Sequence, residues 1–272
     1  MPSAFSYEQN ASPTRQGKSL AEQFRHFYEL GDDPIDRIES FTEHVNADLL
    51  IRPLPTDVEA ISVKDPQTGN IVIGVGTSTS PYRQRFTVAH EVGHILADDI
   101  DRSSEVPQCE PNSPSETRAN SFARNVLCPL DGVKKIAQNL SPTAPETLSK
   151  IIQNFRVSPS VAAIQLKEAG LISEEVCNEL SKEWSAPKLA SLYGWREQYN
   201  ADALVSDQPR PSPRLVADAT KGYRKGVVSA SAVALARGIS SEQVKQELDV
   251  APAEPQPTDS PFAELDAFFE EG

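Results

Sequence analysis

The chain has 272 residues, of which 38% are hydrophobic and 24% are charged, and its formal net charge is −13. This composition is typical of a soluble globular protein with room for one large domain or two smaller ones. It excludes a transmembrane protein, since no run approaches eighteen apolar residues. The acidic charge also disfavours general binding to nucleic-acid backbones.

The N-terminus and the cysteines indicate the compartment. The first eighteen residues have neither a basic start nor an apolar segment, so we expect no signal peptide and a cytoplasmic protein. Cys109, Cys128 and Cys177 are odd in number and have no CxxC spacing. This argues against a disulfide framework and a cysteine zinc ribbon, and indicates reduced thiols.

The N-terminal half is predicted to combine helices with short strands. Residues 1–18 are polar without periodicity and are expected to form a flexible arm, followed by helices over 20–30 and 34–46. Three short strands are then predicted, in "DLLIRP", "DVEAISV" and "GNIVIGVG".

The rest of the chain is predicted to be helical. Ser80-Pro81 and Ser113-Pro114 are start signals for helices that reach residues 97 and 128. A Pro-rich linker is expected over 201–213, then two or three short helices, and a disordered acidic tail over 250–272. The intervening helices are predicted over 131–140, 145–155, 159–169 and 173–185.

The stretch "RFTVAHEVGHIL" contains the sequence His90-Glu91-Val92-Gly93-His94. Residues four apart on a helix lie on one face, so the two imidazoles could share one Zn²⁺. Glu91 is turned aside from the ligand positions but stays near a water on the metal, as a general base must. Gly93 allows another element to pack closely. The alternative is a surface helix with two solvated histidines.

A third ligand decides between these interpretations. One common arrangement takes it six residues after the second histidine, which here is Ile100, so that arrangement fails. The other takes a glutamate from a second helix, and Glu116 lies in the first turns of the predicted helix. Asn120, four residues on, could orient a histidine ligand. The nearby acids Asp98, Asp99 and Asp101 miss the spacing, and Glu105 and Glu110 remain rival ligands in a loop.

Other parts of a peptidase site are less defined by sequence. Tyr82 and Arg85 are weak candidates to stabilise an oxyanion, with packing or solvent exposure as the alternative for each. A substrate could add as a strand to a sheet edge, for which residues 69–76 are the candidate.

Together, "RFTVAHEVGHIL" and "ETRANSFARNVLCP" resemble the ImmA/IrrE family of metallo-endopeptidases. The resemblance extends weakly over residues 20–248 and is specific between 81 and 130. It implies that His90, His94 and Glu116 are zinc ligands and that Glu91 is the catalytic base. Two positions depart from the usual pattern, Arg118 and Cys128. Both could alter a substrate groove without touching the ligands.

The expected fold is α+β, with a zincin-like metallopeptidase core of short strands and two site-bearing helices. We expect this core over residues 19–140, a helical, helix-turn-helix-like region over 141–200, and a small helical segment over 214–249. The expected function is cytoplasmic, zinc-dependent cleavage of a helix-turn-helix repressor, which derepresses stress or mobile-element genes; no direct nucleic-acid binding and no membrane contact are expected.

Two alternatives have different chemistry. The protein could be a zinc-containing regulatory partner of a repressor or DNA without peptide hydrolysis. It could also regulate DNA directly, since "LSKIIQNFRVSPSVAAIQLKEAGLI" has the rhythm of a helix-turn-helix. The second helix of that stretch offers only Gln165 and Lys167 as contacts, so we interpret it as a packing module.

Overall fold

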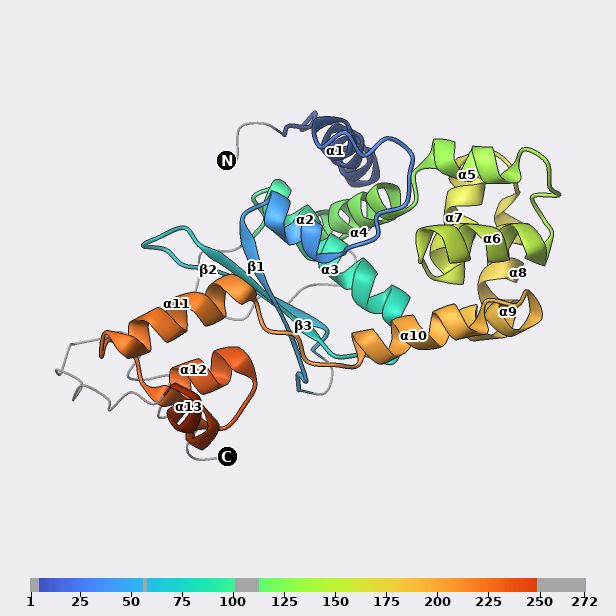
Figure 1. Ribbon diagram of the computed structural model, residues 1–272. Helices are drawn as coiled ribbons and strands as arrows, with labels where there is room; N and C mark the ends of the chain where they lie inside the picture. The colour runs from blue at the N-terminus through green and yellow to red at the C-terminus, as the bar shows by residue number, and fades with distance from the viewer. Residues whose placement is uncertain (1–4, 56–57, 101–112, 249–272) are drawn as a thin grey trace. The chain divides into compact units, whose positions relative to one another are not determined.

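The computed structural model describes residues 5–55, 58–100 and 113–248 (Figure 1). The chain divides into two compact units, Met1–Pro209 and Arg210–Gly272. Helices and one three-stranded sheet make up the first unit, which confirms the expected α+β class. Within the described ranges, no helix combines the length and the apolar character needed to cross a bilayer.

The sheet is formed by β1 (Ala47–Arg52), β2 (Ala60–Lys64) and β3 (Ile71–Gly76), in the order β1-β3-β2. β3 pairs in parallel with β1 and antiparallel with β2. The prediction that residues 69–76 form an edge strand is therefore wrong. β3 takes the central position because its alternate residues are buried and both of its edges are paired, whereas β2 is half-exposed along its length.

Four helices position the site around this sheet: α1 (Pro13–Phe27), α2 (Glu39–His44), α3 (Pro81–Leu96) and α4 (Pro114–Leu127). α3 packs against β2 and β3, α4 lies along α3, and α1 lies along α4 (Figure 1). The start signals at Ser80-Pro81 and Ser113-Pro114 thus mark α3 and α4 correctly.

Two glycines permit the close approach of these helices. A Cβ on Gly93 would lie 3.1 Å from Cα of Ala119 in α4, which confirms the expected close packing beside the histidines. A Cβ on Gly17 would lie only 2.1 Å from the carbonyl oxygen of Arg118. The backbones of α1 and α4 therefore meet at a position where only glycine fits.

The prediction of a flexible arm over residues 1–18 is wrong for the described part, residues 5–18. Ser12 caps α1 by accepting a hydrogen bond from the amide of Arg15, and Pro13 stands in the first turn. Gln16 and Gly17 are buried because α1 docks on α4. The sequence pattern does not indicate this part of α1 because most of its residues are polar and its buried face is narrow. Similarly, only Glu39–His44 of the predicted helix 34–46 is helical.

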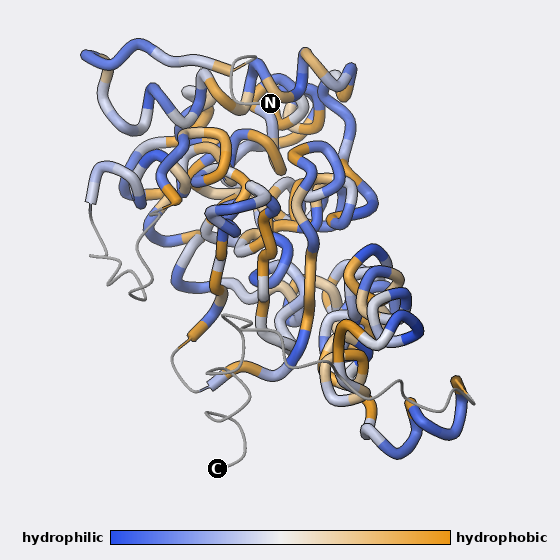
Figure 2. The backbone as a smooth tube through the Cα atoms, turned by 90° about the vertical axis from the view of Figure 1, so that its left-hand side faces the viewer, coloured by the Kyte–Doolittle hydropathy of each residue, from blue (hydrophilic) through white to orange (hydrophobic). Residues whose placement is uncertain are grey.

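Five helices follow α4: α5 (Leu130–Ala137), α6 (Pro145–Phe155), α7 (Pro159–Glu168), α8 (Glu174–Glu183) and α9 (Ala186–Leu192). Hydrophobic and hydrophilic stretches alternate along the tube of the described chain, as expected of elements that bury one face (Figure 2). The apolar faces of these five helices join the same core as the sheet, so the predicted division after residue 140 is not a boundary of the core. Cys128 and Cys177 are buried free thiols within this core, and Cys109 lies outside the described residues.

A further helix, α10 (Arg196–Ser206), occupies part of the predicted linker. Its end is bonded to the end of the sheet and to α3. Gln84 Nε2 donates to the carbonyl oxygens of Gly76 and Ser206, at 2.9 and 2.8 Å, and Ser206 Oγ donates to the carbonyl oxygen of Ser78 at 2.5 Å. Residues 201–206 therefore belong to the first unit rather than to a linker.

The second unit contains three described helices, α11 (Pro213–Arg224), α12 (Ala230–Arg237) and α13 (Ser241–Leu248). They enclose a small core of their own, formed by Tyr223, Ala230, Val233, Ala234 and Val244. The predicted acidic tail over 250–272 lies outside the described residues.

Candidate metal centre

His90 and His94 of α3 meet Glu116 of α4. The Nε2 atoms of the two histidines lie 3.0 Å apart. Glu116 reaches both, with 3.2 Å from Oε2 to Nε2 of His90 and 3.1 Å from Oε1 to Nε2 of His94. All three side chains are at most 15% exposed. Three atoms with lone pairs therefore converge on one point at the surface of the first unit.

This geometry fits a metal ion. Ligands at about 2.1 Å from one tetrahedral ion lie roughly 3.4 Å apart, close to the separations found here. The Ser113 hydroxyl caps α4 by accepting from the amide of Glu116 at 3.3 Å, which fixes the turn that carries the carboxylate. Among the described residues, no other group of three histidine, cysteine or acidic side chains is arranged in this way. The rivals Glu105 and Glu110, and Asp101, lie outside the described residues.

Asn120 contacts the first histidine. Its Oδ1 lies 3.0 Å from Nδ1 of His90, and because an amide oxygen only accepts, His90 carries its proton on Nδ1. Nε2 is then deprotonated and faces Glu116 and His94. This contact selects the tautomer that a metal ligand needs.

Asp99 stands beside the second histidine, a placement that the sequence did not reveal. α3 ends with Asp98 in a left-handed conformation (φ 55°), and the amide of Asp99 donates to the carbonyl oxygen of His94 at 2.9 Å. This is a Schellman ending, which turns the chain back onto the last helical turn. As a result, Oδ2 of Asp99 lies 3.8 Å from Nδ1 of His94.

Arg118 fixes that carboxylate. Its Nη2 donates to Oδ1 of Asp99 at 2.6 Å and its Nε to Oδ2 at 3.2 Å. On the other side, Nη1 donates to Oε1 of Gln16 at 2.8 Å, and the guanidinium lies 5.0 Å from the ring centre of Tyr7. Arg118 therefore acts behind the histidines rather than in a substrate groove, and the N-terminal segment covers it.

Neighbouring charges shift the pKa values of His94 and Asp99. Burial disfavours a charged His94, but the carboxylates of Asp99, Glu91 and Glu116 outweigh it and raise the pKa of His94 above its usual value. Burial likewise opposes a charged Asp99, yet its contacts with His94 and Arg118 hold the pKa of Asp99 below its usual value. The carboxylate is therefore ionised at neutral pH, which suits attraction of a cation.

Glu91 lies between His90 and His94 in the sequence of α3 and contacts β2. Ser62 Oγ donates to Oε2 of Glu91 at 2.5 Å. Ser62 is half-buried and faces α3, whereas its neighbours Ile61 and Val63 are exposed on the other face of the strand. Strand alternation could have indicated which way Ser62 points, but its meeting with Glu91 depends on how α3 crosses the sheet.

Tyr82 and Arg85, the oxyanion candidates, are both buried. Burial lowers the pKa of Arg85 to about 10, and its guanidinium donates to the carbonyl oxygens of Ile35 and Asp36. Burial also raises the pKa of Tyr82, whose ring packs edge-on against that of Tyr199. These contacts favour the packing alternative for both residues.

The helix-turn-helix-like stretch consists of α6 and α7. Gln165, one of its two possible base contacts, is fully buried and donates from Nε2 to the carbonyl oxygen of Cys128 at 2.6 Å. α7 packs against α4, α5, α6 and α8. The second helix of the stretch, α7, is therefore part of the core and is not available to read DNA.

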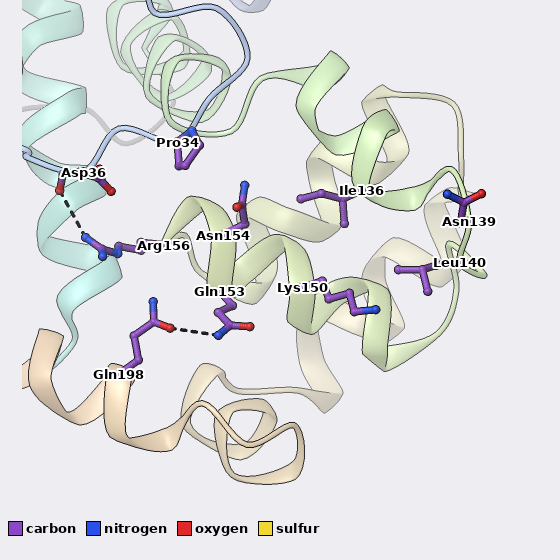
Figure 3. Close-up of a pocket in the computed structure, with 10 residues that line it drawn as sticks. All are labelled: Pro34, Asp36, Ile136, Asn139, Leu140, Lys150, Gln153, Asn154, Arg156 and Gln198. Carbon is purple, nitrogen blue, oxygen red and sulfur yellow. Dashed lines mark hydrogen bonds between the residues drawn. The ribbon is translucent and has the colours of Figure 1, made fainter.

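A depression of mixed polar and apolar character is lined by residues of α5, α6 and α10, by the segment after α5 and by the segment before α2 (Figure 3). Arg156 there donates to the carbonyl oxygen of Asp36 at 3.4 Å, and Gln153 donates to Gln198 at 3.1 Å. Its lining shares no residue with the cluster of His90, His94 and Glu116, so the candidate metal centre is not located in it.

Residues 42–167 match a family model of peptidases, peptidase M78, described as the IrrE N-terminal-like domain. The chain is also 32% identical, over 102 residues, to the radiation response metalloprotease IrrE of Deinococcus radiodurans. That alignment covers 36% of this chain and 31% of the relative, so the chain matches about a third of the relative's length. The α3 and α4 residues of the site lie inside the matched family region, and the resemblance indicated by the motifs is confirmed: residues 42–167 are similar to the peptidase domain of the ImmA/IrrE family.

Proposed function

We propose that the first unit is a zinc-dependent endopeptidase with a zincin-like core. His90, His94 and Glu116 hold the metal, and Glu91 is the general base. The observation that carries this proposal is the convergence of the three ligand atoms within 4.8 Å of one another, with Glu91 one residue from His90 on the same helix. Two imidazoles and one carboxylate leave a fourth position open, as in catalytic rather than structural zinc sites.

When bound by these three residues, zinc would supply a Lewis acid able to polarise a scissile carbonyl and to bring the pKa of a water molecule towards about 7. Glu91 accepts the proton of the attacking water and passes it to the leaving amine nitrogen, as the carbon–nitrogen bond breaks. The hydrogen bond from Ser62 holds one oxygen of this carboxylate, which leaves the other to accept the proton. Asn120 and Asp99 orient the two histidines.

The substrate is proposed to bind as an extended strand along β2. β2 is a terminal strand of the sheet, its side facing β3 is paired, and its Ser62 touches Glu91. A peptide that adds to the outer side of β2 runs past the general base and places one of its carbonyl groups near the metal.

As substrate we propose a helix-turn-helix repressor in the cytoplasm, cut once in an exposed segment. The net charge of −13 suits approach to a basic DNA-binding protein. The relative from Deinococcus radiodurans is a radiation response metalloprotease, which connects a similar protein with a stress response. Cleavage of the repressor would derepress stress or mobile-element genes.

The test incubates the purified chain with a repressor encoded near it and with casein, and measures the products by mass spectrometry. Wild type should cut the repressor once and leave casein nearly intact, and Glu91→Gln should cut neither, because an amide cannot accept the proton. Broad digestion of casein contradicts the narrow specificity. An intact repressor under all conditions favours the second candidate, a zinc-containing partner that binds the repressor without hydrolysis.

A further inference from the structure

The second unit has an architecture that the peptidase proposal does not use. α11, α12 and α13 surround a core in which Val233 and Val244 are fully buried. α12 and α13 are joined by three residues, Gly238, Ile239 and Ser240. Gly238 is left-handed (φ 68°), and the amide of Ile239 donates to the carbonyl oxygen of Ala234 at 3.1 Å. A three-residue turn with a left-handed glycine between two short helices is typical of a helix-turn-helix.

The start of α13 is defined by a reciprocal cap. Ser240 Oγ accepts from the amide of Gln243 at 3.2 Å, and Oε1 of Gln243 accepts from the amide of Ser240 at 3.0 Å. This capping box fixes the direction in which α13 leaves the turn. The helix therefore has a defined orientation on α12, as a recognition helix needs.

The first turns of the two helices meet at one place. Ser241 Oγ of α13 lies 3.3 Å from Ser231 Oγ of α12. The amide ends of both helices, with their partial positive charge, thus lie side by side and carry serine hydroxyls. In DNA complexes of this motif, this end of the recognition helix faces the bases while the first helix crosses the backbone.

α13 also differs from α7, the second helix of the buried stretch in the first unit. Val244 is its fully buried residue, whereas Glu242, Gln243, Lys245 and Gln246 are exposed within the unit. Lys and Gln side chains are common readers of guanine and adenine edges. Gln165 of α7, in contrast, is fully buried.

The charge of the described part of the second unit is opposite in sign to that of the whole chain. Residues 210–248 contain seven lysine and arginine residues and three acidic residues, a net charge of +4, although the whole chain carries −13. One of the three acids, Glu247, is paired with Arg237 at 2.5 Å. The three-helix segment is therefore basic and attracts phosphate, although residues 249–272, which follow it, contain seven acidic residues and no basic one.

We propose that residues 210–248 bind double-stranded DNA, with α13 in the major groove and the serine-bearing start of α12 on the backbone. This activity is independent of the metal site. It differs from the expectation of no nucleic-acid binding, which rested on the charge of the whole chain. Lys245 and Gln246 are the proposed base contacts.

The experiment uses the full chain and a pool of random 25-base-pair duplexes at 50 mM salt. The duplexes enriched by wild type are labelled, and their affinity is measured by fluorescence anisotropy. Lys245→Ala with Gln246→Ala should lower the affinity about tenfold or more. The matched control is Lys150→Ala with Gln153→Ala, which removes the same two side chains from α6 in the first unit (Figure 3) and should leave the affinity within about twofold of wild type.

Thermal melting of both variants serves as the control for folding, and each should melt as a folded protein. Binding that weakens steeply between 50 and 200 mM salt, and that the α13 variant alone reduces, supports the proposal. No binding up to about 100 µM protein, equal losses in both variants, or tighter binding to a single-stranded RNA of the same length overturns it. Glu91→Gln should bind DNA as wild type does, so a failure of the peptidase proposal leaves this result interpretable.

Discussion

Arg118 donates three hydrogen bonds to the carboxylate of Asp99, and Oδ2 of Asp99 in turn lies 3.8 Å from Nδ1 of His94. The other face of the guanidinium is held by Gln16 of α1. A chain of polar contacts thus runs from the N-terminal helix to the cluster of His90, His94 and Glu116. It explains why an arginine stands at position 118, and it connects the packing of α1 to the orientation of a histidine.

Replacement of Asp99 should weaken metal binding without unfolding the protein. Asp99→Asn keeps the size of the side chain but removes the charge that orients His94 and attracts a cation, so the affinity for zinc should fall about 10- to 100-fold. Competition with a chelator of known affinity measures this. The control is Asp98→Asn, whose carboxylate is 65% exposed and pairs with Lys64. Equal effects of the two changes would exclude a specific role for Asp99.

Truncation should locate the end of the first unit. A chain that ends at Pro209 retains α10 and should melt at the temperature of the first unit in the full protein. A chain that ends at Asn200 loses the contacts of Ser206 with Gln84 and Ser78. At about 1 kcal/mol for each hydrogen bond, together with lost packing, its unfolding free energy should fall by about 2–4 kcal/mol.

Circular dichroism melts of the two truncated proteins decide this, and zinc content should follow the same order. Equal stability of the two would mean that residues 201–206 are a linker after all. Loss of folding in the longer protein would mean that residues 210–248 are needed by the first unit.

Removal of the hydroxyl at position 62 should slow peptide cleavage while leaving the metal in place. Ser62→Ala deletes the hydrogen bond that holds Glu91 Oε2, so kcat/KM should fall roughly tenfold, as expected for a hydrogen bond to a charged group. Ser62→Thr retains a hydroxyl and suits a strand, and it should recover most of the activity. Wild-type kcat/KM in Ser62→Ala would remove Ser62 from the positioning of Glu91.

The sequence predicts those parts of the site that depend on local geometry. His90 and His94 are four residues apart on a helix that Ser80-Pro81 begins, and Glu116 follows a second start signal of the same kind. Their meeting needs only that α3 and α4 pack together, which Gly93 permits. These features follow from helix periodicity and capping, and both signals can be recognised in a single sequence.

The remaining features depend on tertiary contacts or on an unusual turn. Asp99 reaches His94 only because Asp98 adopts a left-handed conformation. The sequence does not predict this conformation, because the usual glycine is absent from that position. Gln16 reaches Arg118 because α1, whose sequence is mostly polar, docks on α4 through Gly17. Ser62 meets Glu91 through the crossing of α3 over the sheet. None of these contacts leaves a periodic signal in the sequence.

The most direct test of the account is the zinc content of purified wild type and four variants, measured by elemental analysis. Wild type and Glu91→Gln should each hold about one zinc per chain, His90→Ala and His94→Ala should hold almost none, and Glu116→Ala should hold much less than wild type, because three protein ligands are needed for this type of site. Zinc retained in either histidine variant, or lost from Glu91→Gln, would contradict the proposed roles. Unchanged zinc in Glu116→Ala would assign the third ligand to another acidic residue.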